Sequence, residues 1–433
     1  MASALSQTLE KEHIVKAPNE ATLRYRQIRE TSLNQFFTRV KIAEILTEQF
    51  SNNIPRKIID LGAGEGSLSA AMAKRWPNAE IVTVDIDQSC ANELGANLKA
   101  AGNKKHHHVI HDVLDAQLTK SLSGFGSFDA AVCNPPFFKP AWKDDFASIL
   151  KAANLLDACS SKADLSAEML FLAQNINLVK PGGLVALIVP DGFLTGWRTT
   201  ALRKNLLQNH RIECVIQLPA HSFHETEARC FMLFVTRSGK PSEKVKLIRY
   251  EGALSEAIYI TRSAAEKRMD YDYHASHTEH EDFITLRHLD ADIKRGSISM
   301  AEAKSTSLKV FHTTDFSDHP AEIRFVSKPQ NVSSRVIVAE PGDILMARVD
   351  RNLHQKIAIV QSGSAILSDC VYRIRVAPSL QRQVFEAMKS EAGIAKILSA
   401  TKGVGARLIG KADLLDLPFE IEADLSLSSK KLL

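Results

Sequence analysis

Strand-length apolar segments alternate with helical segments through the first half of the chain. Helices between strands act as crossovers, so this alternation predicts βαβ units and an α/β domain with a mostly parallel sheet. Only residues 220–229 separate the last two strands, which is too short for a crossover helix, so we expect that pair to be antiparallel. The seven expected strands, of which one is antiparallel, are Lys57–Leu61, Glu80–Ile86, His107–His111, Phe128–Cys133, Gly183–Val189, Ile212–Leu218 and Cys230–Thr236.

The length of 433 residues allows two or three domains. The alternation weakens after the seventh strand, and the Ser-Gly-Lys-Pro-Ser segment at residues 238–242 has the composition of a boundary. Short β-like segments and one helical stretch, Leu380–Leu398, follow from residue 310 onward. We therefore expect a first domain over residues 1–240, with a helical N-terminal segment, and a second, α+β domain over residues 241–433.

The composition is that of an ordinary folded protein with a mild positive charge. The net charge of +4 permits a nucleic-acid partner without demonstrating one. The six cysteines lack the CxxC spacing of zinc ribbons, so we expect reduced thiols. The N-terminal residues lack the apolar stretch of a signal peptide, and the apolar runs are too short to span a bilayer, which predicts a cytoplasmic protein without membrane association.

A glycine-rich loop, Asp60-Leu61-Gly62-Ala63-Gly64-Glu65-Gly66, follows the first expected strand and opens a helix. Glycines allow a tight turn and a close approach of ligand to backbone. The next two strands end in acidic residues. Asp85 can accept hydrogen bonds from ribose hydroxyls, and Asp112 can accept one from an adenine amino group. Together these residues predict a nucleoside-containing cofactor at the carboxyl edge of the sheet.

A second motif, Asn134-Pro135-Pro136-Phe137, directly follows the fourth expected strand. An exocyclic amine is a poor nucleophile because its lone pair is delocalised into the ring. The Asn134 side-chain oxygen and the Pro135 carbonyl can each accept one N–H, and the prolines stiffen the loop. Phe137 offers a face for stacking on a flipped base. The motif therefore predicts a site that holds an amino group in place for an aligned, in-line displacement.

The order of these parts resembles the S-adenosylmethionine pocket of Rossmann-like methyltransferases. That resemblance implies the same fold, S-adenosylmethionine as cofactor and S-adenosylhomocysteine as product. The segment Asn34–Thr38 resembles the N-terminal motif of DNA adenine methyltransferases, although Arg39 stands where those often carry proline. The cofactor-binding residues that the resemblance implies are Phe37, Thr38, Asp60, Gly62, Gly64, Gly66, Asp85, Ile86, Asp112, Val113 and Asn134.

The glycine loop precedes the Asn-Pro-Pro-Phe motif, an order that resembles the gamma class of DNA N6-adenine methyltransferases. The resemblance covers roughly residues 30–237 and makes Asn134, Pro135, Pro136 and Phe137 the expected catalytic residues. Residues 219–226 resemble the Phe-x-x-Thr loop of related enzymes, so Phe223, with Phe138, is an expected contact of the target base; a hairpin with a packed aromatic side chain explains Phe223 equally well.

The C-terminal region resembles the target-recognition domains of type I restriction specificity subunits. The ordered segments behind this resemblance are 340–345, 358–360, 368–374, 403–406 and 414–418. It implies double-stranded DNA as partner, a monomer or dimer, and a restriction-modification or phage-defence role in which any endonuclease is a separate chain. Expected DNA contacts are Lys139, Trp142, Lys143, Trp197 and Arg198 at the active-site rim, and Arg348, Arg351, Lys356, Arg373 and Arg375 in the second domain.

Alternatives to DNA adenine methylation stay open. Protein-glutamine methylation poses the same chemical problem at an amide nitrogen, although that family usually carries tyrosine at the Phe137 position. RNA adenine-N6 methylation and a non-catalytic DNA-binding modification subunit are further readings. Consecutive histidines on a strand point to opposite faces, so His106, His107 and His108 make a poor chelate and no metal site is expected.

Overall fold

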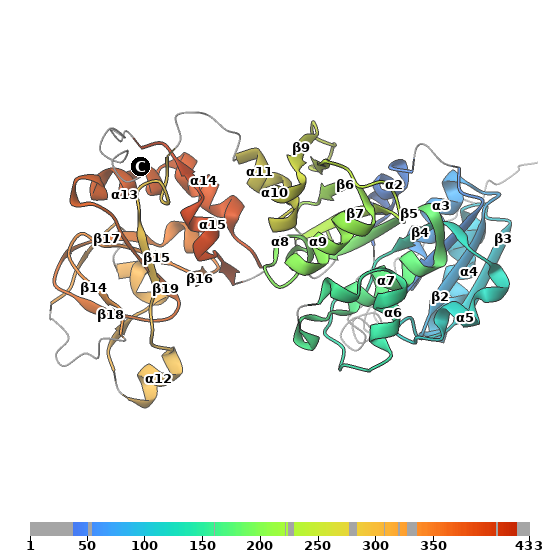
Figure 1. Cartoon of the computed structure of the whole chain (residues 1–433), viewed down its shortest axis with the longest axis horizontal. Helices are drawn as coiled ribbons and strands as arrows, with labels where there is room; N and C mark the ends of the chain where they lie inside the picture. The colour runs from blue at the N-terminus through green and yellow to red at the C-terminus, as the bar shows by residue number, and fades with distance from the viewer. Residues whose placement is uncertain are drawn as a thin grey trace, which may run out of the picture.

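The structure is a computed structural model, shown in Figure 1. It describes residues 38–50, 54–159, 161–220, 222–223, 229–276, 284–306, 308–318, 321–326, 336–403 and 406–421. The described chain forms two units that lie side by side, the first built on a large sheet and the second on smaller sheets and helices.

The first unit is built on a nine-stranded sheet with the order β3-β2-β1-β4-β5-β7-β6-β8-β9. Strands β1 to β5 pair in parallel, whereas β7 runs antiparallel between β5 and β6. The α/β fold class and the antiparallel pairing of the sixth and seventh strands are therefore confirmed. The strands are β1 Lys57–Leu61, β2 Glu80–Asp85, β3 Lys105–Ile110, β4 Phe128–Cys133, β5 Val179–Pro190, β6 Arg211–Gln217, β7 Cys230–Thr236, β8 Lys244–Arg249 and β9 Ile258–Thr261.

The expected strand count of seven was too low, because β8 and β9 extend the sheet. β8 pairs in parallel with β6, and β9 pairs antiparallel with β8. In β8 the buried Val245 and Leu247 alternate with Lys244 and Lys246, so this strand lacks the continuous apolar run that marks a buried parallel strand. The sheet thus continues past the boundary expected at residues 240 and 241, and that division of the chain stays a prediction.

Helices cover both faces of this sheet because successive strand residues point to opposite sides. Ile58 belongs to an apolar cluster that includes residues of α2, α3 and α4, whereas Ile59 belongs to the cluster on the other face, which includes residues of α5 to α10. Across the described ranges, no helix combines the length and apolar character needed to cross a bilayer. The helices are α2 Val40–Glu48, α3 Ser67–Arg75, α4 Ala91–Ala100, α5 Leu118–Ser121, α6 Phe146–Ala152, α7 Ala167–Leu178, α8 Asp191–Thr195, α9 Thr200–Asn209, α10 Arg262–Lys267 and α11 Tyr271–Ser276.

The second unit has its own apolar core around a five-stranded sheet of order β11-β19-β15-β17-β13. Smaller sheets pair β12, β18 and β14, β10 with β21, and β16 with β20. Its strands are β10 Ile284–Thr285, β11 Asp292–Arg295, β12 Val310–Phe311, β13 Glu322–Arg324, β14 Val338–Ala339, β15 Ile344–Ala347, β16 Val349–Asp350, β17 Ile357–Ser362, β18 Ala365–Leu367, β19 Val371–Arg375, β20 Arg407–Leu408 and β21 Pro418–Phe419. Its helices are α12 Met300–Ser305, α13 Gln381–Lys389, α14 Glu391–Ala400 and α15 Lys411–Leu415.

The single helical stretch expected at Leu380–Leu398 is two helices, which corrects that prediction. Ser390 separates α13 from α14 with extended backbone angles, φ −61° and ψ 158°. Its hydroxyl accepts a hydrogen bond of 3.0 Å from the Gly393 amide and caps the start of α14. Apolar periodicity continues across the break, so it could not reveal a cap that divides the segment.

Candidate active site

The glycine loop between β1 and α3 adopts a conformation that requires glycine. Gly62, Gly64 and Gly66 have φ values of 72°, 54° and 82°. A Cβ atom on Gly62 would lie 3.0 Å from the Phe171 ring, and one on Gly66 would lie 3.1 Å from Leu94. Side chains at both ends of the loop would collide with α7 and α4, so glycine lets the loop pack closely against these helices.

Asp85 at the end of β2 holds this loop in place. Its Oδ2 atom accepts a 2.7 Å hydrogen bond from the Gly64 amide, and its Oδ1 atom accepts one of 2.9 Å from the Asp87 amide. The neighbouring Ile86 is 59% exposed, an unusual position for an isoleucine that directly follows a buried strand. An apolar surface beside a buried carboxylate fits a nucleoside, whose ribose is polar and whose base is apolar on its faces.

Asp60 precedes the glycine loop and is almost completely buried. Its Oδ2 atom accepts a 2.6 Å hydrogen bond from the Ser69 hydroxyl, whereas Oδ1 has no hydrogen-bond partner among the described residues. Burial raises the pKa of this carboxyl to about 7. A buried acceptor next to the loop supports the expectation that a polar ligand completes this site.

Replacing Asp60 with asparagine is expected to flatten the dependence of stability on pH. Between about pH 4 and 7 the folded protein retains a proton on Asp60 that the unfolded chain releases, so the free energy of unfolding falls as pH rises through this window. Asp60→Asn removes this titration and leaves an acceptor for Ser69. Urea unfolding at pH 5 and pH 8 measures how much the free energy of unfolding changes between these pH values. An equal decrease in wild type and variant would contradict the raised pKa of Asp60.

Asp112 and Val113 form the turn after β3. Asp112 is half-buried, and its Oδ1 atom accepts a 2.8 Å hydrogen bond from the Leu114 amide. Val113 is buried, and its carbonyl accepts a 3.1 Å hydrogen bond from Gln174 of α7. The turn is therefore fixed at the same carboxyl edge as Asp85, because β2 and β3 are parallel neighbours.

Asn134 follows β4 directly, one strand from β1 and the glycine loop. Its Nδ2 atom donates a 3.1 Å hydrogen bond to the Thr38 hydroxyl. That bond turns the other side of the amide, the Oδ1 acceptor, away from Thr38. Two residues predicted from separate motifs therefore meet, although 96 positions separate them in the sequence. Phe37 lies outside the described residues.

The rest of the Asn-Pro-Pro-Phe loop is anchored to its surroundings. Pro135 is buried, Pro136 is half-buried, and Phe137 packs at the edge of the apolar cluster that α2, α3 and α4 share. The Phe138 carbonyl accepts a 3.0 Å hydrogen bond from the Ala167 amide at the start of α7. These contacts limit the movement of the two acceptors at Asn134 and Pro135.

Cys133 adjoins the motif but serves the sheet. Its thiol lies 3.0 Å from the Leu61 carbonyl and links the ends of β4 and β1. Burial raises the pKa of this thiol well above its usual value. A thiol held protonated is a poor nucleophile, in agreement with an amino-methyltransferase rather than a cytosine C5 enzyme.

Phe223, the expected second contact of the target base, is only 2% exposed. It belongs to the same apolar cluster against which Phe137 packs. Residues 221 and 224–226 of the predicted Phe-x-x-Thr loop lie outside the described residues. The packed arrangement favours the hairpin interpretation in the described conformation, and the base contact stays a prediction.

Exposed basic and aromatic side chains surround this edge of the sheet. Lys139 and Lys143 are exposed on the loop after the Asn-Pro-Pro-Phe motif. Trp197 is 75% exposed, and the Arg198 guanidinium lies 5.2 Å from its ring centre. Arg198 also lies 3.8 Å from Asp164, so the loop of Trp197 contacts the short helical turn Lys162–Asp164. DNA contact at these positions stays a prediction.

Several predicted DNA contacts in the second unit are instead engaged in ion pairs. These pairs are Arg373 with Asp292 at 2.7 Å, Arg375 with Asp343 at 2.6 Å and Lys356 with Asp350 at 2.7 Å. Such neutralised side chains are poor phosphate ligands, so the structure argues against these candidates. Arg348 donates to the Asp369 carbonyl at 2.8 Å, and Arg351 is exposed. Arg348 and Arg351 stay candidates for DNA contacts.

Two of the three histidines of β3 contact the same hydroxyl group. His106 and His108 both lie 2.9 Å from the Thr83 Oγ1 atom, on one face of the strand. His107 points to the other face, toward the Phe125 ring at 5.3 Å. Within the described ranges, no group of three or more potential ligands is placed to hold a metal ion.

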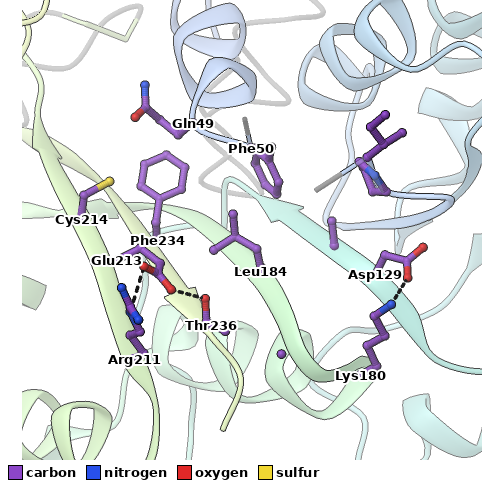
Figure 2. Close-up of a pocket in the computed structure, with 14 residues that line it drawn as sticks. Gln49, Phe50, Asp129, Lys180, Leu184, Arg211, Glu213, Cys214, Phe234 and Thr236 are labelled. Atoms are coloured by element: carbon purple, nitrogen blue, oxygen red, sulfur yellow. Dashed lines mark hydrogen bonds and ion pairs between the residues drawn. The ribbon is translucent and has the colours of Figure 1, made fainter. Parts of the chain in front are cut away.

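A cavity of about 520 Å³ lies at the opposite, amino edge of the sheet (Figure 2). Phe50, Phe234 and Leu184 form its apolar wall. Its charged side chains pair with one another, Lys180 with Asp129 at 2.6 Å and Arg211 with Glu213 at 3.0 Å. The cavity lies where β4, β5 and β6 begin, whereas Asn134 lies where β4 ends. The cavity is therefore separate from Asn134.

Sequence reasoning missed Arg203 of α9, which is completely buried. Its guanidinium donates to the carbonyls of Gly196 at 2.9 Å, Glu266 at 3.0 Å and Lys267 at 2.6 Å. Burial lowers its pKa to about 10, so the group stays charged at neutral pH. Arg203 thereby ties the rim loop of Trp197 to α10. An arginine in an amphipathic helix gives no sequence signal of such a role.

Comparisons with known proteins bear on the family and the fold. The family model described as N-6 DNA Methylase matches residues 13–279. A tRNA1(Val) (adenine(37)-N6)-methyltransferase of Porphyromonas gingivalis is 29% identical over 167 residues, which cover 38% of this chain and 62% of that protein. A release factor glutamine methyltransferase of Gloeobacter violaceus is 28% identical over 140 residues, covering 31% of this chain and 46% of that protein.

Among solved structures, the type IIG restriction endonuclease BpuSI is similar in fold, with a TM-score of 0.53 and 15% sequence identity. The match covers 92% of this chain and 60% of that chain. The chain thus spans less than two thirds of the length of each of these relatives. The family model, by contrast, covers more than half of the 433 residues. The chain therefore belongs to the N-6 DNA methylase family.

Proposed function

We propose that this protein transfers a methyl group from S-adenosylmethionine to the N6 amine of an adenine flipped out of double-stranded DNA. The observation that carries the proposal is the position of Asn134, at the carboxyl end of β4 beside the glycine loop, with its amide oriented by Thr38. A reaction between a nucleoside cofactor and an amine needs these two parts close together, and the neighbouring strands β1 and β4 bring them to one edge. The family description, an N-6 DNA methylase, supports adenine in DNA as the acceptor.

The residues at this edge fit the cofactor. Asp85, the exposed Ile86 and Asp112 are expected to hold its nucleoside part, while Asp60 and the glycine loop are expected to hold its amino-acid part. When bound, S-adenosylmethionine supplies an electrophilic methyl group on its sulfonium. The Thr38 hydroxyl orients Asn134 at the point where that methyl group must be presented.

Asn134 and Pro135 activate the amine by position. The Asn134 Oδ1 atom accepts one N–H of the target amine and the Pro135 carbonyl accepts the other, which favours a tetrahedral nitrogen with its lone pair directed at the methyl group. Phe137 stacks on the flipped base and recovers part of the cost of unstacking, a few kcal/mol. Proximity and alignment then supply most of the acceleration.

The second unit and the rim are proposed to hold the DNA. Lys139, Lys143 and Arg198 would contact phosphates, and Trp197 would stack on an exposed base. A restriction-modification or phage-defence role, with any nuclease in a separate chain, follows from the resemblance of the second unit to target-recognition domains.

Nucleoside analysis tests the proposal directly. Purified protein and S-adenosylmethionine are incubated with unmethylated genomic DNA, with tRNA and rRNA, and with a glutamine-containing protein mixture. Each product is hydrolysed and analysed by mass spectrometry. N6-methyladenine in DNA alone supports the proposal. Methylation of RNA alone would instead establish the second candidate, which the tRNA methyltransferase of Porphyromonas gingivalis favours.

Lys139→Gln is expected to weaken DNA binding without changing site preference. Loss of one phosphate contact lowers the slope of log affinity against log salt concentration by about one. Fluorescence anisotropy with a DNA duplex at several salt concentrations measures this slope. Lys74→Gln, at the end of α3 and also exposed, serves as the charge-matched control. Equal slopes for both variants would remove Lys139 from the DNA-binding surface.

A further inference from the structure

A cluster of buried charges joins the first unit to the second. The Arg268 and Asp270 side chains are 3% and 0% exposed, and two hydrogen bonds of 2.6 Å link them. Arg268 also lies 3.6 Å from Asp413 of the second unit. Asp191 and Arg229 form a second pair at 2.8 Å. Neither the glycine loop nor the Asn-Pro-Pro-Phe motif uses these charges.

Asp191 connects three distant segments of the chain. It begins α8 directly after β5, at the same edge of the sheet as Asn134. Its Oδ1 atom accepts from Arg229, the last residue before β7. Its Oδ2 atom accepts a 3.1 Å hydrogen bond from the Gly403 amide of the second unit. Arg229 donates in addition to the Thr401 carbonyl at 3.1 Å.

Gly403, which Asp191 holds, lies next to a pair of short strands, β16 and β20, that we call the arginine ribbon together with Arg348 and Arg351. Lys402 and Leu408 exchange two backbone hydrogen bonds of 2.8 Å. Leu408 and Arg407 form β20, which pairs with β16. Arg348 and Arg351 flank β16 on either side. Figure 1 shows β16 on the side of the second unit that faces α8. The segment that contacts the first unit at Gly403 therefore also leads to the arginine ribbon.

We propose that the Asp191–Arg229 pair is a positioning device that sets this arginine ribbon in register with the methyl-transfer edge. The inference rests on the proposed function. In it, the arginine ribbon contacts the phosphates or bases next to the flipped adenine. Phosphate contacts fix the register of a protein on a duplex, and small misplacements of a substrate are costly for catalysis. Asp191 is 4% exposed and Arg229 is 20% exposed, so a shifted geometry leaves a largely buried carboxylate uncompensated.

Asp191→Asn tests the proposal. Arg229 and the Gly403 amide are both donors, so the NH2 group of an asparagine opposes one of them whichever way the amide is turned. We expect the KM for DNA to rise about tenfold, as when phosphate contacts lose their register. We expect kcat to change far less and S-adenosylhomocysteine binding to stay at the wild-type value. Sequencing of methylated sites is expected to show relaxed selectivity.

Gly403→Ala disturbs the same contact from the second unit without removing a buried charge. Gly403 has a φ of 92°, which alanine adopts only with strain. We expect the same rise in KM, so the proposal stays testable if Asp191→Asn folds poorly. Asp191→Glu keeps the carboxylate and is expected to recover part of the wild-type KM. Asp129→Asn is the matched control, because it breaks an ion pair at the opposite edge of the sheet. Its KM for DNA should equal that of wild type.

The outcomes separate this inference from the proposed function. Wild-type KM and site choice in both Asp191→Asn and Gly403→Ala would overturn the inference alone. A loss confined to kcat would also overturn it, because Asp191 would then act in the chemical step. A wild-type protein that methylates no DNA would overturn the proposed function and this inference with it.

Discussion

Replacing Asn134 with alanine is expected to slow methyl transfer strongly while cofactor binding persists. The variant loses the acceptor that holds the target amine, and it loses the hydrogen bond to Thr38 at 3.1 Å. Removal of one preorganised polar group of this kind lowers kcat by about 10²- to 10³-fold. The cofactor contacts at Asp60, Asp85 and the glycine loop are retained. N6-methyladenine formation per unit time, measured by mass spectrometry, gives the rate.

Two variants complete this experiment. Asn134→Asp keeps an acceptor at the same position and is expected to retain part of the activity, since related motifs carry either residue. Cys133→Ala is the neighbouring control; it removes a thiol that only links two strand ends, and it is expected to stay active. Thermal shift with S-adenosylhomocysteine reports cofactor binding. Loss of that shift in Asn134→Ala, or full activity of the variant, would contradict the assigned role.

Asp270→Asn is expected to give the largest loss of stability. It leaves the Arg268 guanidinium buried without its carboxylate partner, and breaking a buried pair in this way costs about 3–5 kcal/mol. The unfolding midpoint in urea should fall accordingly. Arg382 forms a pair of equal length, 2.6 Å, with Glu386 on the surface of α13. Arg382→Gln is therefore the matched control, and its midpoint should not change.

The same pair sets an acid limit for stability. Burial opposes ionisation of Asp270, but the attraction of Arg268 is stronger and lowers the pKa of Asp270 below its ordinary value of 3.8. The contribution of this carboxylate to stability is therefore present above pH 3.8 and is lost as pH falls through the lower, folded-state value. Urea unfolding between pH 3 and pH 6 checks the sign; a variant that parallels wild type throughout this range would refute it.

The arrangement of Asp60, Asp85, Asp112 and Asn134 follows from local sequence. Each lies within two residues of the end of a strand, and parallel strands present their carboxyl ends at one edge. The glycines that bear positive φ values lie at the first of these ends. Periodicity and strand ends are properties of short segments, so the sequence alone was sufficient to place the candidate active site on this edge.

Other features depended on contacts between distant segments. The chain separates Asp191 from Arg229 by 38 positions and from Gly403 by 212, so no local pattern marks them as partners. Arg373 and Arg375 read as free basic residues until the fold brings Asp292 and Asp343 beside them. The sequence determined the edge at which the chemistry is placed. Only the tertiary structure decided which charges stay available for a ligand, because pairing depends on which segments pack together.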